Sequence, residues 1–440
     1  PVTVGTTTGA DITAELVSID DQGSQRIRLD AADTYEFTLP MPGAFNVANA
    51  ALAAAMAQTA GVDLRAFLGG LEQAAVPGRM ERIDEGQPFV AVDTEFMRVD
   101  TFYPIAGLLQ VSSGDGAYLI DPLRISDWRP FAALLEAPNV VKVLHSCSED
   151  LEVFLRLSGS LPAPLFDTQL AAGYLNLGFS MGYSRLVQEV LGIELPKGET
   201  RSDWLQRPLS ELQVRYAAED VLHLVEVYRA LMARLAPQKV EWIIEDGAEL
   251  VANLGREVAP EDAWREAKLA WKLSRQQQAV LRALCAWRER EARARNQPRN
   301  RVLREHSLWP LARTQPDNLV ALARIEDMHP KTVRQDGETL LKLIREAAAL
   351  PPEQWPEALP EPLPVEASAL LKKLRAVGQR EGERLDIVPE LMLRKKTLEA
   401  LLKSGYPHGP YQLPDSLRGW RRELMGQALL DCLAAEGESA

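Results

Sequence analysis

Two carboxylates placed two residues apart are the first feature of this sequence that could do chemistry. They end the apolar run Phe89-Val-Ala-Val-Asp93-Thr-Glu95. Such a run predicts a short buried strand, and residues i and i+2 of a strand point to the same face. Strand ends are where α/β sheets bind ligands, and paired oxygen ligands suit Mg²⁺ or Mn²⁺. A strand followed by a polar turn gives the same short motif by chance, so other residues must decide.

A second acid follows another predicted strand. The strand is expected over residues 140–144 and delivers His145-Ser-Cys-Ser-Glu-Asp150 at its end. A helix is expected from Ser148 onward, with the Ser148 hydroxyl as its N-cap. Asp150 is therefore predicted to lie in the first turn of a helix, directly beyond a strand.

A third predicted element carries a tyrosine and a further acid. Ser210 is expected to cap a helix on which Tyr216 and Asp220 are four residues apart. That spacing places both side chains on one face, one turn apart. Taken alone, the pair is better explained as a packed phenol with a hydrogen-bond partner.

Length and composition limit the class of protein. A chain of 440 residues, 46% hydrophobic and 25% charged, is typical of a soluble protein with two to four domains. It has no apolar run of about 18 residues and no signal peptide, and it begins with Pro1, which indicates a fragment or a processed end. Its three cysteines are widely spaced, which predicts a reducing, cytoplasmic location. The net charge of −13 argues against indiscriminate nucleic-acid binding but permits a local basic surface.

Residues 1–88 differ from the rest of the chain. We expect short strands between residues 3 and 29, then two helices that end near residues 60 and 74. The segments Gly43-Ala-Phe-Asn46 and Pro77-Gly-Arg-Met-Glu81 resemble the late central domain of Mur ligases, in particular the tripeptide synthetases. The first 88 residues contain no Lys for an ATP phosphate loop. We therefore interpret this arm as a ligase-like fragment without ligase activity.

From residue 89 the pattern changes to alternating strands and helices. The motifs Asp93-Thr-Glu95, Asp150 and Tyr216-x-x-x-Asp220 together resemble the three exonuclease motifs of the DEDD superfamily, in its Tyr-bearing branch. Longer segments resemble the ribonuclease D family from about residue 89 to the end, among them Asp167-Thr-Gln, Arg201-Ser-Asp-Trp204 and Tyr216-Ala-Ala-Glu-Asp220. The resemblance implies an α/β exonuclease domain over residues 89–262, with a ribonuclease H-like mixed sheet and flanking helices.

The resemblance also implies a mechanism, 3′→5′ exonucleolytic cleavage with two Mg²⁺ or Mn²⁺ ions. Two ions about 4 Å apart can activate water, offset phosphate charge and stabilise the departing 3′ oxygen. By the same resemblance, Asp93, Glu95 and Asp220 hold one ion and Asp93 bridges to the second. Asp150 acts on the second ion through water, and Tyr216 positions or deprotonates the attacking water.

Three nearby residues allow two interpretations each. Phe96 could form an apolar surface for the terminal base or could pack in the core. His145 could contact a substrate phosphate or could bond only to the backbone. Cys147 could suggest a zinc site, but no second Cys or His–Cys pair accompanies it in the sequence.

After Asp220 the sequence is predominantly helical. Residues 275–350 and 365–440 resemble HRDC domains, separated by a stiff proline-rich linker over residues 351–364. Eight arginines stand against two glutamates between residues 282 and 304. A charge run is usually a solvated face, but in this acidic chain it suggests RNA-phosphate contacts, for which we name Arg288, Arg293 and Arg295.

The combined prediction is a monomeric, metal-dependent exoribonuclease that trims RNA 3′ ends, without a membrane or an obligate protein partner. Precursors of tRNA are the substrates that the resemblance implies. Three alternatives remain at this point. They are a DNA-directed 3′ exonuclease, a non-catalytic RNA-binding protein whose site is disrupted by the arm, and a residual peptidoglycan ligase.

Overall fold

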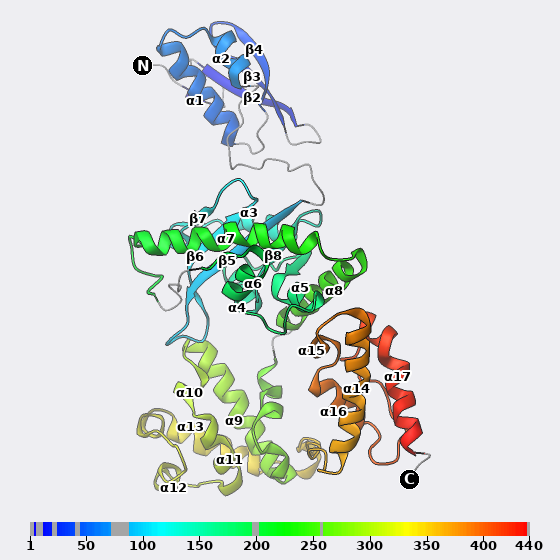
Figure 1. Ribbon diagram of the computed structural model, residues 1–440. Helices are drawn as coiled ribbons and strands as arrows, with labels where there is room; N and C mark the ends of the chain where they lie inside the picture. Colours follow the sequence, from blue (N-terminus) through cyan, green and yellow to red (C-terminus); the bar gives the residue numbers. More distant parts are fainter. Residues whose placement is uncertain are drawn as a thin grey trace. The chain divides into compact units, whose positions relative to one another are not determined.

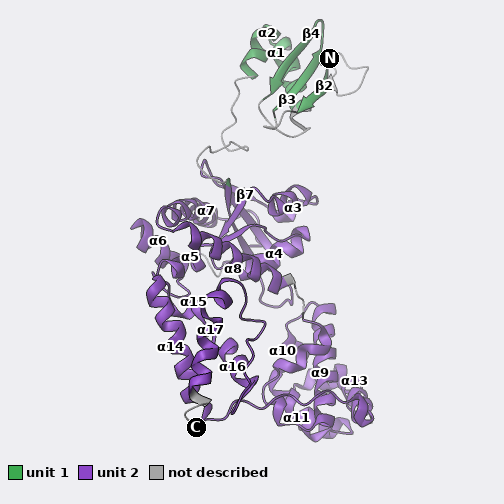
Figure 2. Ribbon diagram, turned by 90° about the vertical axis from the view of Figure 1, so that its right-hand side faces the viewer, with its two compact units in different colours: residues 1–88 green, residues 89–440 purple. Residues whose placement is uncertain are grey.

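The structure, a computed structural model, describes residues 4–5, 12–19, 24–39, 45–71, 88–195, 202–255 and 258–437. The chain forms two compact units, residues 1–88 and residues 89–440 (Figure 2). Each unit is described by itself.

The first unit is a small four-stranded sheet with two helices. Its strands, in the order β1-β2-β3-β4, are Val4–Gly5, Ile12–Ile19, Gln25–Asp30 and Thr34–Leu39, and its helices are α1 (Phe45–Thr59) and α2 (Leu64–Leu71). Alternate residues of β2, β3 and β4 pack under the helices and form a closed core. Strand β4 is absent from the predicted strands, although its sequence Thr-Tyr-Glu-Phe-Thr-Leu alternates as a strand should. The segment Pro77–Glu81 lies outside the described residues.

The second unit begins with a mixed five-stranded sheet. Its order is β7-β6-β5-β8-β9, with β5, β6 and β7 antiparallel and β8 and β9 parallel to β5. The strands are β5 (Phe89–Met97), β6 (Ile105–Ser112), β7 (Tyr118–Ile120), β8 (Val141–Leu144) and β9 (Leu165–Asp167). This confirms the predicted mixed sheet and places the Asp93-Thr-Glu95 segment on its central strand.

Helices cover both faces of this sheet (Figure 1). They are α3 (Arg129–Glu136), α4 (Ser148–Ser158), α5 (Thr168–Tyr174), α6 (Tyr183–Leu191), α7 (Glu211–Met232) and α8 (Pro237–Gly255), with a 3₁₀ turn η1 at Pro122–Arg124. Successive residues of β5 serve different cores. Ala91 packs with Leu224 and Val225 of α7, whereas Val90 and Val92 pack with α3 and α4. The next residues of β5 continue this alternation, so that their side chains also point by turns to the two faces of the sheet.

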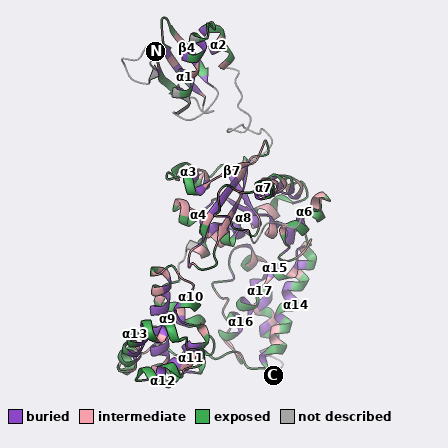
Figure 3. Ribbon diagram, turned by 90° about the vertical axis from the view of Figure 1, so that its left-hand side faces the viewer, coloured by how far each residue is buried: buried purple, intermediate pink, exposed green. Residues whose placement is uncertain are grey.

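The first helical domain follows the α/β domain and has a separate core, to which the β5–β6 loop contributes Phe102 and Tyr103 (Figure 3). It comprises α9 (Arg275–Ala294), α10 (Arg299–Val302), α11 (Glu305–Thr314), α12 (Leu319–Ala323) and α13 (Pro330–Ala348). Two 3₁₀ turns, η2 (Pro260–Glu266) and η3 (Ala270–Lys272), precede α9, and η2 packs closely on it. Helix α13 begins at Pro330, whose ring supplies a preset helical φ in the first turn.

The second helical domain packs directly on the α/β domain. It contains α14 (Ala367–Leu385), α15 (Pro389–Met392), α16 (Lys395–Lys403) and α17 (Gly419–Gly437), after a proline-rich segment with a 3₁₀ turn η4 (Pro352–Gln354). Its buried leucines and those of α5 to α8 form one continuous core. Within it, the buried carboxylate of Asp246 on α8 accepts hydrogen bonds from Tyr174, Trp420 and Arg421.

Candidate active site

Three carboxylates from two elements converge on the second half of β5. The short strand predicted to end just before the acids instead continues past both of them to Met97, because its pairing with β6 continues past them. Asp93 and Glu95 point to the same face of the strand, as their spacing predicts, and this face is the one that α7 covers. Asp220 projects from α7 toward them. Ligand oxygens of Asp93, Glu95 and Asp220 all lie within 4.8 Å of one another. Three oxygen donors at this separation are a suitable set for a divalent cation.

Asp150 approaches from the other face of the sheet. The intervening residue of β5, Thr94, points toward α4, and its hydroxyl donates a hydrogen bond of 2.5 Å to Asp150 Oδ1. Asp150 is 8% exposed and lies in the first turn of α4. Asp93 and Glu95 point to one face of β5, and Thr94 between them points to the other face, toward Asp150. Asp150 therefore lies beside the cluster of three carboxylates but is not part of it.

The start of α4 corrects one prediction. Cys147, and not Ser148, is the N-cap residue, and no side chain of the helix caps it. The carboxylate of Asp167, which caps α5, instead accepts hydrogen bonds from the backbone N–H groups of Ser146 and Cys147. One carboxylate thus orients the first turns of two helices, including the turn that carries Asp150.

The start of α7 is as predicted. Ser210 and Gln213 form a reciprocal capping box, which fixes where the helix begins. Tyr216 and Asp220 lie one turn apart, and the Tyr216 ring is 6.2 Å from the buried ring of Trp204. The hydroxyl of Tyr183 on α6 donates to the backbone carbonyl of Asp220. The position of Asp220 is therefore set from two sides.

Burial raises the pKa of every carboxyl group in this cluster, and repulsion from neighbouring acids adds to the rise for Glu95, Asp150 and Asp220. Burial raises the pKa of Asp93 to about 6. Burial and the neighbouring acids raise the pKa of Glu95 to about 9. Burial and the charge of Asp93 raise the pKa of Asp220 to about 8, although a hydrogen bond from Tyr216 lowers it. The pKa of Asp150 is also raised well above its ordinary value, by burial and by Asp93.

These raised pKa values are those expected of a cation-binding site without its cation. In the protein alone, four carboxyl groups cannot all ionise side by side. A divalent cation removes the repulsion and allows all of them to ionise, and their hard oxygens match Mg²⁺ or Mn²⁺. The pKa of Tyr216 is raised by burial and by Asp220, so the phenol is neutral near pH 7. Burial also raises the pKa of Cys147, and within the described ranges no group of three or more metal-binding side chains includes it.

The other two residues named near the motifs occupy the margin of the site. Phe96 is half-buried, directly after Glu95, where a β-bulge interrupts the pairing of β5 with β6. His145 is partly buried, with Nδ1 2.9 Å from the Thr168 hydroxyl and its ring 5.3 Å from that of Tyr183. Burial lowers the pKa of His145, which favours a neutral imidazole. A substrate contact by either residue stays a prediction.

The three arginines named for RNA contacts all have partners inside the first helical domain. Arg288 pairs with Glu305 at 2.7 Å, and Arg293 pairs with Glu289 at 2.8 Å. Arg295 forms a bidentate pair with the buried Asp336. Their charges are therefore offset locally. An RNA contact by these arginines stays a prediction, and the structure gives each of them a structural role.

A different group of basic residues lacks such partners. Arg324, Lys331 and Arg334, at the corner of α12 and α13, are exposed. No described carboxylate lies within ion-pair distance of them. Sequence spacing does not single them out, because Asp327 is three positions from Arg324 and four from Lys331, and Glu338 is four positions from Arg334. In the described parts of the chain, no helix has the length and apolar content needed to cross a bilayer.

Comparisons with known proteins agree with this geometry. Residues 75–236 match a family model described as 3′-5′ exonuclease, and residues 277–344 match the HRDC domain. Ribonuclease D of Pseudomonas paraeruginosa is 71% identical over 347 residues, covering 79% of this chain and 92% of that protein. Ribonuclease D of Escherichia coli is 40% identical over 354 residues, covering 79% and 93%. The crystal structure of Escherichia coli RNase D, described as an exoribonuclease involved in structured RNA processing, superimposes with a TM-score of 0.73 at 38% identity, over 79% of this chain and 93% of that one.

Proposed function

The chain belongs to the ribonuclease D family, and from that premise we propose that it removes nucleotides one at a time from the 3′ ends of RNA, with tRNA precursors among its substrates. The observation that carries the proposal is the convergence of Asp93, Glu95 and Asp220 within 4.8 Å. A site that served only to bind RNA would not concentrate carboxylates, because they repel phosphate.

The protein groups have distinct roles in this proposal. Asp93, Glu95 and Asp220 would hold one cation, and Asp93 with Asp150 would direct the second. Mg²⁺ or Mn²⁺, when bound, supplies the charge that lowers the pKa of water and offsets the developing charge on the phosphate. Thr94 holds the Asp150 carboxylate in place through its 2.5 Å hydrogen bond.

Tyr216 orients the attacking water in this proposal. Its raised pKa keeps the phenol protonated near pH 7, so it is poorly suited as a general base. A neutral hydroxyl on the same helix face as Asp220 can hold a water molecule by hydrogen bonds. The half-buried Phe96 ring, beside Glu95, offers an apolar surface on which the terminal base can stack.

The helical domains would grip the RNA away from the scissile bond. Residues 275–350 contain 15 Lys and Arg against 9 Asp and Glu, in a chain whose net charge is −13. Binding through phosphates would depend strongly on salt concentration. The second helical domain is HRDC-like in this proposal, and the protein acts in the cytoplasm as a monomer.

The first unit has no assigned role in this reaction. Its sequence segments resemble a Mur ligase, and the first 88 residues contain no Lys for an ATP phosphate loop. We infer an inactive ligase-like unit, for which an assay of ATP-dependent amide-bond formation on a muramyl-peptide acceptor should give no product.

The decisive experiment is digestion of a 3′-extended tRNA labelled at its 5′ end, with and without Mg²⁺. The full chain should shorten the RNA from its 3′ end only when Mg²⁺ is present. Asp150→Ala should abolish shortening, and Glu149→Ala should not, because Glu149 is exposed on the same helical turn. Equal activity of Asp150→Ala and the unchanged protein would refute the proposal. A single-stranded DNA competitor that is degraded faster than the RNA would favour a DNA-directed exonuclease instead.

A further inference from the structure

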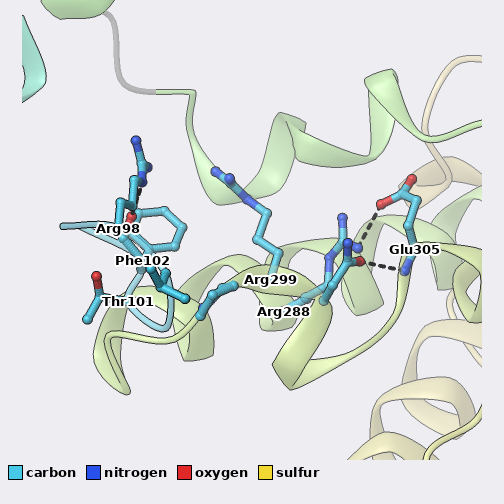
Figure 4. Close-up of a pocket in the computed structure, with 9 residues that line it drawn as sticks. Arg98, Thr101, Phe102, Arg288, Arg299 and Glu305 are labelled. Atoms are coloured by element: carbon cyan, nitrogen blue, oxygen red, sulfur yellow. Dashed lines mark hydrogen bonds and ion pairs between the residues drawn. The ribbon is translucent and has the colours of Figure 1, made fainter. Parts of the chain in front are cut away.

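The loop between β5 and β6 joins the nuclease domain to the first helical domain. Beside this loop is a pocket of about 470 Å³, lined from the nuclease side by Arg98, Thr101 and Phe102 and from the helical side by Arg288, Arg299 and Glu305 (Figure 4). Because the pocket leaves one side of the loop without packing, the position of the loop depends on a few specific contacts.

The helical domain holds the loop through an amide and an aromatic ring. Asn296 Oδ1 accepts hydrogen bonds from the backbone N–H groups of Phe102, at 3.1 Å, and Tyr103, at 3.0 Å. The Phe102 side chain is 8% exposed and belongs to the helical domain's core. The Arg299 guanidinium lies 4.7 Å from the centre of the Phe102 ring. The tip of the loop therefore packs as part of the helical domain, although in sequence it lies between two strands of the nuclease domain.

The nuclease domain holds the same loop through two arginines. The Arg156 guanidinium on α4 lies 4.0 Å from the centre of the Tyr103 ring, and Arg98 makes the hydrogen bonds. Arg98 donates to the Phe102 carbonyl oxygen, at 3.1 and 2.8 Å, and to both oxygens of Glu152, at 2.6 and 3.2 Å. Arg98 follows Glu95 by three residues along β5 and the loop, and Glu152 follows Asp150 by two residues in α4. Arg98 therefore connects the strand and the helix that carry opposite sides of the metal site.

The two helical domains are attached in different ways. The second shares a continuous core with α5 to α8. Within the described residues, the core of the first takes only Phe102 and Tyr103 from the nuclease domain. An ion pair between Arg301 and Asp100 adds to the same loop. The β5–β6 loop is therefore where the first helical domain can influence the nuclease site.

We propose that the Asn296–Phe102–Arg98–Glu152 series positions Asp150 relative to Asp93 and Glu95. Arg98 lies three residues after Glu95, and its partner Glu152 lies two residues after Asp150, so their ion pair sets the spacing between β5 and α4 beside the carboxylates. That spacing is fixed only while Asn296 and the helical core hold the loop in place. Asn296, Arg98 and Glu152 are positioning residues, because none of them reaches the reacting atoms. The inference rests on the proposed exonuclease function, since it concerns the same metal site.

The test uses the full chain and a trinucleotide RNA, which is too short to need the helical domain for binding. Asn296→Gly removes the side-chain acceptor and tolerates the backbone φ of 48° at this position. Asn296→Asp restores an acceptor oxygen and tolerates the same φ. Arg98→Gln breaks the bridge from the other end, and Arg345→Gln is the matched control, on an exposed residue of α13 with no described carboxylate partner.

Asn296→Gly and Arg98→Gln should each lower kcat on the trinucleotide by roughly tenfold, with KM changed less than twofold, because small displacements of catalytic groups are costly. Mn²⁺ affinity, measured by electron paramagnetic resonance without substrate, should weaken severalfold in both. Asn296→Asp should recover most of both losses, and Arg345→Gln should change neither. Unchanged trinucleotide kcat and Mn²⁺ affinity in both variants, with losses only on long RNA, would overturn the proposal and leave the loop as an attachment alone. Inactivity of the unchanged protein would instead refute the exonuclease function.

Discussion

Metal binding to this site should release protons, and the number follows from the raised pKa values of its carboxyl groups. At pH 7 in the metal-free protein, Glu95 with a pKa of about 9 and Asp220 with a pKa of about 8 are both mainly protonated. Asp93, with a pKa of about 6, is mainly ionised. A cation requires all three as carboxylates, so binding should release about two protons at pH 7 and about half a proton at pH 9. The apparent Mg²⁺ affinity should therefore rise about 50-fold between pH 7 and pH 8.

Calorimetric titration with Mg²⁺ in buffers of different ionisation enthalpy measures this number directly, as the slope of heat against buffer enthalpy. Asp220→Asn should reduce the count at pH 7 by about one proton. Asp115→Asn should leave it unchanged, because Asp115 is an exposed residue in the loop after β6. A release of less than half a proton at pH 7 would show that the carboxylates are already ionised without metal, and would refute the reasoning.

The same linkage predicts how stability changes with pH. Carboxyl groups with raised pKa values bind more protons in the folded than in the unfolded protein, between their ordinary value near 4 and their raised values. The free energy of unfolding of the metal-free protein should therefore fall as the pH rises through this window, up to about 9 for Glu95. Saturating Mg²⁺ should abolish the fall, because it binds the ionised form. Urea unfolding at pH 6 and pH 8.5, with EDTA or Mg²⁺, tests both statements, and a metal-free protein that is more stable at the higher pH would contradict them.

Three further predictions concern other parts of the chain. Tyr216→Phe should lower kcat by roughly 10²-fold with little change in KM, because it removes a hydroxyl that acts in the chemical step; steady-state kinetics on a short RNA would expose an error if KM alone rose. Arg324→Gln with Lys331→Gln should lower the slope of log Kd against log salt concentration by about 1.5, because two phosphate contacts are lost. Arg345→Gln should leave the slope unchanged. Filter binding to tRNA at several salt concentrations measures this slope, and equal slopes would exclude the corner of α12 and α13 as an RNA contact. Arg421→Met should lower the free energy of unfolding by about 3 kcal/mol, since it leaves its buried carboxylate partner on α8 without a countercharge; urea unfolding checks this value, and a loss under 1 kcal/mol would count against it.

Several features of the nuclease domain follow from the sequence alone, because they depend on local periodicity. The two-residue period of a strand puts Asp93 and Glu95 on one face, and the helical period puts Tyr216 and Asp220 one turn apart. The Ser210 cap is equally local, since it involves residues three positions apart. The mixed sheet follows from the resemblance of these motifs to known exonucleases. Strand β4 is equally local, because Thr-Tyr-Glu-Phe-Thr-Leu alternates as a strand should, although it is absent from the predicted strands.

Contacts between distant segments needed the tertiary structure. No local pattern indicates that Asp167 caps the turn that carries Asp150, since the two residues reach each other through separate strands. The dense arginines of α9 looked like a nucleic-acid surface, but Arg295 pairs with an acid 41 residues away. Asn296 similarly satisfies backbone groups almost 200 residues distant in sequence. Sequence therefore determined which acids form the site and on which faces they lie. Only the fold decided which charges remain free and what holds the site together, because pairing partners are chosen by packing and not by spacing.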